Sequence, residues 1–193
     1  MSLSLGIGLG LTMLNVNKGE SSMILLSTKT ASGDATLEFT ELNSSVYNSY
    51  VLMLGNVTTN IDGELIARTS SNGGTSYDSG VSDYDRTGVY TLANNATALT
   101  ANQVGVSEIN LVWGQRIEST KDGFSGSICI LNPHLAQETQ MLFEGAYIGD
   151  SGFFSHQRGA GVRKSSANVN AIQISVAVAA NMPSGTISLY GIK

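Results

Sequence analysis

Residues 169–178 read VNAIQISVAV, and this stretch decides the fold class. Its even-numbered positions from Ile172 to Val178 are all apolar, while the positions between them are small or polar. Side chains alternate between the two faces of a β-strand, so a period of two predicts a strand with one face in a core. We expect this strand to lie in the interior of a sheet.

From residue 22 onward the chain contains further stretches of this kind, rich in β-branched and aromatic residues. We expect strands at residues 23–29, 35–40, 50–57, 64–70, 84–92, 106–114, 124–131, 140–148, 152–156, 171–179 and 185–192. The clusters ASGD (31–34), DG (62–63) and NGG (72–74) predict hairpin turns between successive strands. Residues 91–104, rich in Ala and Asn, form the one stretch that fits a short helix.

The composition supports the same fold class. The chain has 22 Gly and only 2 Pro, which is typical of many short strands joined by tight turns. Its 193 residues, 41% of them hydrophobic, are enough for one sizeable core. We therefore predict an all-β protein with two parts: an extended N-terminal arm at residues 1–21 and a single, jelly-roll-like β-sandwich domain at residues 22–193.

The proposed arm has a period of two of its own, in which Ser and Gly separate five large apolar residues. These five residues are Leu3, Leu5, Ile7, Leu9 and Leu11. Such a segment suits insertion into a groove or sheet edge of another subunit, and we interpret it as a docking arm. An ordinary first strand and a disordered tail are the alternatives. It has no basic residue before Lys18, which argues against a signal peptide, and it is too short to span a membrane.

Charge and motifs exclude several classes of function. The net charge of −5 and the absence of a basic run argue against nucleic-acid binding. A single cysteine, Cys129, cannot form a disulfide within the chain, and we expect it to pack in a half-buried strand. His134 and His156 are expected on the surface or in turns. No motif of a catalytic nucleophile, phosphate loop or metal site occurs, so we expect no enzyme and no cofactor.

One segment has the composition of a ligand contact. Tyr77, Asp78, Asp83, Tyr84 and Asp85 lie within nine residues, and tyrosines beside acids often bind sugars by stacking and hydrogen bonding. We name them as candidates for contact with a glycan or receptor. The carboxylates also suit Ca²⁺, although their spacing differs from that of an EF-hand loop. Ordinary strand tyrosines and solvated loop carboxylates are the plain alternative.

Residues 69–77 (TSSNGGTSY) and 184–193 (SGTISLYGIK) resemble segments of small bacteriophage virion proteins, whose β-sandwich domain closes with a GTISLYG strand. The resemblance implies a tail fibre or adhesin subunit, made in the host cytoplasm and located in the virion, which the arm attaches to other virion proteins. Baseplate and head-decoration proteins, and an independent carbohydrate-binding module, are the alternatives. Such virion proteins are frequently trimeric. With only 13% charged residues to cover its surface, this chain too is expected to be a homo-oligomer, a trimer in the first instance.

Overall fold

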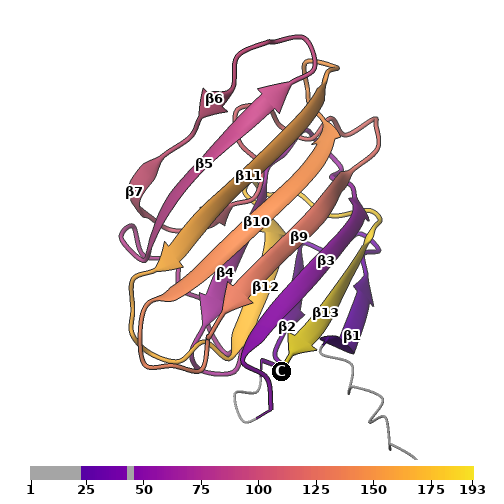
Figure 1. The fold of residues 1–193 in the computed structure, drawn as a ribbon. Helices are drawn as coiled ribbons and strands as arrows, with labels where there is room; N and C mark the ends of the chain where they lie inside the picture. The colour runs from indigo at the N-terminus through magenta and orange to yellow at the C-terminus, as the bar shows by residue number, and fades with distance from the viewer. Residues whose placement is uncertain (1–22, 43–45) are drawn as a thin grey trace, which may run out of the picture.

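The computed structural model describes residues 23–42 and 46–193, which fold into two antiparallel β-sheets packed face to face (Figure 1). Among these residues there is no helix. The predicted all-β fold and its sandwich architecture are confirmed. The N-terminal arm lies outside the described residues.

The large sheet has nine strands. Eight of them follow one another in the order β1-β13-β3-β9-β10-β11-β5-β6, and β7 also pairs with β5. Their bounds are β1 Met23–Thr30, β3 Ser49–Val57, β5 Tyr84–Leu92, β6 Leu99–Thr100, β7 Gln103–Val106, β9 Phe124–Leu131, β10 Thr139–Ile148, β11 Phe154–Arg163 and β13 Thr186–Ile192.

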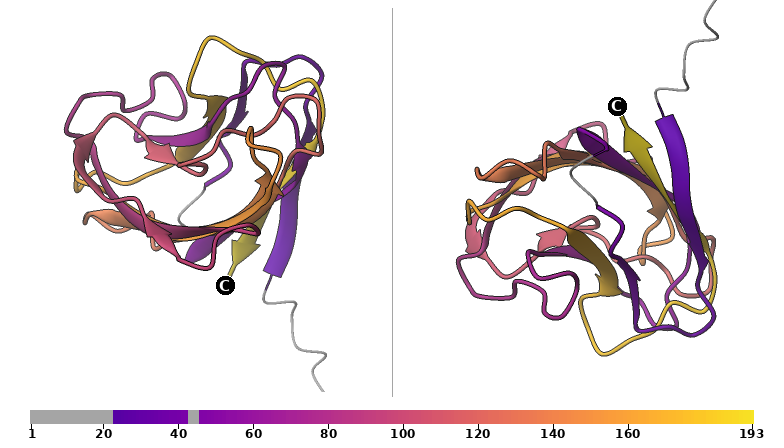
Figure 2. Two further views of the ribbon diagram at one scale, coloured as in Figure 1. Left: turned by 90° about the horizontal axis from the view of Figure 1, so that it is seen from above. Right: turned by 90° about the horizontal axis from the view of Figure 1, so that it is seen from below.

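The small sheet has four strands in the order β2-β12-β4-β8. Their bounds are β2 Thr36–Phe39, β4 Leu65–Ser70, β8 Ile109–Asn110 and β12 Ala171–Val176. Seen from either end, the large sheet curves around the small one (Figure 2). The core therefore fills the space between them, and the opposite face of the large sheet is turned outward.

The chain crosses repeatedly between the two sheets, and this corrects the predicted hairpins. β1, β3 and β5 belong to the large sheet, whereas β2 and β4 belong to the small one. The turns at 31–34, 62–63 and 72–74 therefore each lead from one sheet to the other. Glycines at 33, 73 and 74 do have positive φ angles, as tight reversals of the chain require, so the turns predicted at 31–34 and 72–74 are present. A turn residue reverses the chain but does not determine which strand the next one pairs with.

Three segment predictions were wrong in other ways. The expected helix at 91–104 is absent, and two short strands, β6 and β7, pair with β5 in this region. The expected strand at 106–114 is represented only by β8 and the end of β7, because its apolar residues 111–113 are buried in a connection outside any strand. The strand expected at 152–156 begins at Phe154 and runs on to Arg163 as β11, through a glycine-rich stretch.

The alternating stretch 169–178 contains β12, residues 171–176, which is an interior strand as predicted. β12 lies between β2 and β4, and the side chains of Ile172, Ile174 and Val176 are buried in the core. Val178 lies beyond the end of the strand and is 43% exposed. The opposing side of the core comes from alternate residues of the large sheet, such as Leu52 on β3 and Ile128 on β9.

Two cross-strand pairs of glycines make room for aromatic rings in this core. Gly126 on β9 lies directly opposite Gly145 on β10, and a Cβ atom added at Gly145 would lie 2.1 Å from Cζ of Phe124. Gly88 on β5 lies opposite Gly159 on β11 in the same way, under the ring of Trp113. The rings thus occupy space that any side chain at these positions would fill.

Candidate functional site

The outward face of the large sheet carries a row of apolar side chains that crosses five adjacent strands. The register of the strands places these residues side by side, in the order Leu25, Tyr190, Val51, Cys129 and Leu142. Leu25 is 54% exposed and Leu142 is 49% exposed, while the three between them are partly exposed. We call these five residues the apolar row.

The surroundings of this row are poor in charge. Met53, 46% exposed, lies on β3 two residues from Val51, so it stands on the same face. On the same face, Glu144 lies two residues from Leu142 on β10, and its register partner is Arg158 on β11. Glu144 also lies 2.9 Å from the imidazole of His156. The outward face of a sandwich sheet is normally polar, so an apolar row on this scale marks it as a candidate interaction surface.

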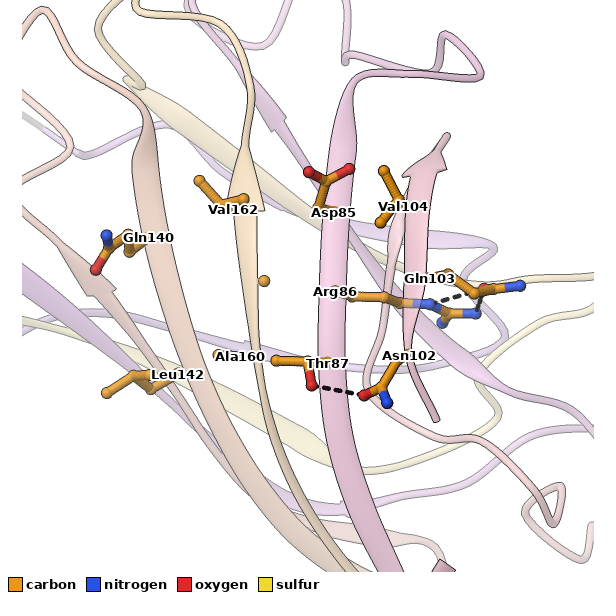
Figure 3. A pocket seen from close by; sticks show the side chains of 11 residues that line it. Asp85, Arg86, Thr87, Asn102, Gln103, Val104, Gln140, Leu142, Ala160 and Val162 are labelled. Atoms are coloured by element: carbon orange, nitrogen blue, oxygen red, sulfur yellow. Dashed lines mark hydrogen bonds between the residues drawn. The ribbon is translucent and has the colours of Figure 1, made fainter. Parts of the chain in front are cut away.

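Beyond Leu142 the same face is hollowed. A groove of about 500 Å³ lies between β10, β11, β5 and β7. Its lining residues are Asp85, Arg86, Thr87, Asn102, Gln103, Val104, Gln140, Leu142, Ala160, Gly161 and Val162. In Figure 3, Leu142 and Gln140 stand at one side of the groove, and Asn102, Gln103 and Val104 stand at the other.

Hydrogen bonds hold the polar rim of the groove in place (Figure 3). The Thr87 hydroxyl donates to the amide oxygen of Asn102 over 2.6 Å, and the Arg86 guanidinium donates to Gln103. Ala160 and Val162, which lie between the two sides, are apolar, as is Leu142. Such a groove can accept an apolar segment with a polar edge, or a hydroxyl-rich ligand whose groups reach the amides.

The segment from Tyr77 to Asp85 does not form one contact site. The ring of Tyr84 is fully buried, which corrects its assignment as a candidate for ligand contact. Its hydroxyl oxygen accepts a hydrogen bond from the Thr69 amide over 2.8 Å, and it donates to the carbonyl of Asp78. Burial raises the pKa of Tyr84, as it raises the pKa of Tyr77 to about 12. Tyr84 is thus a core residue that ties β5 to the neighbouring sheet.

The three carboxylates of this segment serve separate internal bonds. Asp78 pairs with the guanidinium of Arg163, which is almost fully buried. Asp83 accepts a hydrogen bond from the Gly80 amide over 2.6 Å. Asp85 accepts from the Gly105 amide and then from Lys164, and these contacts lower its pKa.

Of the five candidates in this segment, only Asp85 lines the groove. Within the described part of the chain, no three residues among His, Cys, Asp and Glu lie close enough to hold a metal ion.

The remaining predicted residues fall in three places. Leu3, Leu5, Ile7, Leu9 and Leu11 lie outside the described residues, so the docking arm stays a prediction. Cys129 is half-buried on β9, as expected, and His156 lies on the outward face of β11. His134 is partly buried between β9 and β10.

The apolar row was not predicted from the sequence, although one signal was present. Residues 50–54 read YVLML, apolar at every position and not at every second one. Such a run is typical of a strand that is covered on both faces. The inward residues Tyr50, Leu52 and Leu54 are indeed buried in the core, whereas the outward pair Val51 and Met53 has no cover within the described chain.

Comparisons with protein-family models, with curated proteins and with solved structures found no match. No helix in the described residues is long and apolar enough to cross a membrane.

Proposed function

We propose that this chain is a structural subunit of a bacteriophage particle, in the first instance of a tail fibre or adhesin. In this proposal the N-terminal arm anchors the subunit to other virion proteins and the β-sandwich projects for attachment to the host. The observation that carries the proposal is the apolar row on the outward face of the large sheet. Baseplate and head-decoration proteins share the same physical requirements and remain alternatives within the virion.

The apolar row favours an assembly role because it is costly for a lone domain in water. Burying a Leu or Met side chain is worth about 1.5–3 kcal/mol, and this stabilisation is available only when another surface covers the row. The core between the two sheets is formed by other residues, so the exposed part of the row adds nothing to that core. In a subunit of an assembly, a neighbouring protein can cover such a face.

The anchoring role of the arm is tested by matched charge substitutions. We expect Leu5→Asp together with Leu9→Asp to leave the sandwich folded, because both positions precede β1, the first strand of the described sandwich. The same variant should be lost from purified particles, since a carboxylate is costly in an apolar groove. The control, Ser4→Asp together with Gly8→Asp, places equal charge on the other side of the alternating segment and should be incorporated.

Mass spectrometry of purified particles measures both variants. Equal incorporation of the two variants contradicts anchoring by the apolar side of the arm. Absence of the unmodified protein from purified particles contradicts the virion assignment itself.

A carbohydrate-binding role is the second candidate, and the groove beside Leu142 favours it. Its rim offers amide groups from Asn102, Gln103 and Gln140, which suit the hydroxyl groups of a sugar. None of its lining residues is aromatic, so the usual stacking platform is missing. A glycan array with the intact protein, repeated with Asn102→Ala, tests this role. Binding that survives the substitution unchanged locates the sugar elsewhere.

A further inference from the structure

Resting on the proposed role as a structural subunit, we propose that the apolar row is the surface through which copies of this chain associate. The row and its neighbour Met53 form the centre of the contact, and the occupant is a second copy of the same sheet face. Glu144 and Arg158 stand at its border. This assigns the interface of the homo-oligomer to particular residues on the outward side of β1, β13, β3, β9 and β10.

The size of the face fits an interface between two proteins. Strands lie about 4.8 Å apart and rise about 3.4 Å per residue, so the five adjacent strands of the row, from β1 to β10, measure about 19 Å across. With about eight residues along each strand, this part of the face covers roughly 520 Å². Two copies packed against each other would then cover about 1,000 Å² in total, which is the lower limit for a specific interface between proteins.

The charge pattern favours a second copy over a charged partner of another kind. The apolar row itself has no charged member, so it gives no electrostatic preference for a nucleic acid, an anionic surface or a basic peptide. At the border, Glu144 and Arg158 face each other across β10 and β11. A symmetric contact presents both charges from each copy, so the border carries equal numbers of opposite charges and needs no charged partner protein.

The thiol of Cys129 can report whether this surface is covered. Cys129 is the only cysteine in the sequence, and it stands in the row between Val51 and Leu142. Its thiol is partly exposed in the single chain, and burial raises its pKa. A thiol reagent applied at alkaline pH to the intact protein therefore reports directly whether the row is covered.

The experiment compares the unmodified full chain with two charge variants. Leu142→Glu introduces a carboxylate into the row, and Ile61→Glu introduces the same charge in the loop between β3 and β4. These two side chains are equally exposed, at 49% and 47%, so the variants differ in place and not in burial. Light scattering gives the mass, a disulfide reagent gives the rate of thiol modification, and circular dichroism confirms that each variant is folded.

We expect the unmodified protein and Ile61→Glu to be oligomers and Leu142→Glu to be a monomer. The Cys129 thiol of the two oligomers should react at least tenfold more slowly than the Cys129 thiol of Leu142→Glu. Met53→Glu provides a second variant in the same contact, should Leu142→Glu fail to fold. An oligomer whose thiol reacts as fast as that of the folded monomeric variant overturns the proposal, as does a monomer at micromolar concentration. A monomer that becomes reactive only when residues 2–14 are deleted shows that the arm covers the row, which also overturns it.

These outcomes separate the interface from the virion role. A protein that is present in particles but monomeric with a reactive thiol refutes the interface alone. An oligomer with a protected thiol that is absent from particles refutes the virion role alone.

Discussion

The glycine pair under Phe124 leads to a quantitative prediction for Gly145→Ala. A Cβ atom at this position would lie 2.1 Å from Cζ and 2.5 Å from Cε2 of the Phe124 ring, so one of the two must move. Phe124 is itself fully buried, between β9 and the rest of the core, and has little room to retreat. Overpacking of this kind costs about 1–3 kcal/mol.

Two further effects change this cost of overpacking in opposite directions and nearly cancel. Gly145 has no positive φ, so alanine introduces no backbone strain and gains about 0.4–1 kcal/mol by restricting the unfolded chain. The strand cannot bend away freely, because Gly145 is paired with β9 on one side and β11 on the other. We expect a net loss of about 2 kcal/mol in the free energy of unfolding, or about 4–8 °C in Tm for a domain of this size.

Equilibrium unfolding in urea, followed by circular dichroism, measures the loss. Gly55→Ala on β3 is the matched control, since its new Cβ meets no atom closer than the rotatable hydroxyl of Thr186, at 3.1 Å. The decisive variant combines Gly145→Ala with Phe124→Leu, whose shorter side chain removes the colliding ring. Phe124→Leu alone should cost about 1–2 kcal/mol, and the double variant should be more stable than the sum of both losses predicts. Additive losses, or a Gly145→Ala variant as stable as the unmodified protein, would refute the collision.

Three further predictions concern the segment around Tyr84. Tyr84→Phe removes the hydroxyl that accepts from the buried Thr69 amide, and it should cost about 1–3 kcal/mol in urea unfolding, whereas a sugar-contact role predicts no loss of stability. Asp78→Ala leaves the buried guanidinium of Arg163 with carbonyl partners only, and we expect a loss of up to about 3 kcal/mol that Asp78→Asn partly restores. The pKa of Asp85 is lower in the folded protein than in the unfolded chain. The ionised carboxylate of Asp85 therefore stabilises the fold at any pH above its pKa in the unfolded chain, and this stabilisation is lost as the pH falls through its pKa in the folded protein. Asp85→Asn should therefore flatten the loss of stability below about pH 4, and identical acid profiles would contradict this assignment.

How well the sequence predicted each strand depended on the alternation within it. Residues 84–92 and 124–131 were predicted with their observed bounds. In 124–131 the alternating residues Phe124, Ile128 and Ile130 are apolar and face the core, and in 84–92 Tyr84 and Tyr90 alternate in the same way. Residues 111–113 are also apolar, but they are buried in a connection that belongs to no strand. A period of two identifies which side chains are inside but not which strand lies next to them. For that reason the strands were largely found, while the hairpins between them were not.

The site was harder to predict than the fold for a physical reason. Tyr84 belongs to a strand whose inward residues are fixed by the register with β11, and no local pattern distinguishes its buried hydroxyl from an exposed one. The apolar row is assembled from residues on five strands that are remote in sequence, such as Leu25 and Leu142. Only the order of the strands in the sheet brings them together.

The most direct test of the account is a reconstruction of the purified bacteriophage particle at a resolution that resolves β-strands. The account predicts that the sandwich is found in the particle, with the outward face of its large sheet packed against the same face of another copy around Cys129 and Leu142. A particle that lacks the protein, or one in which that face is open to solvent in every copy, would contradict it.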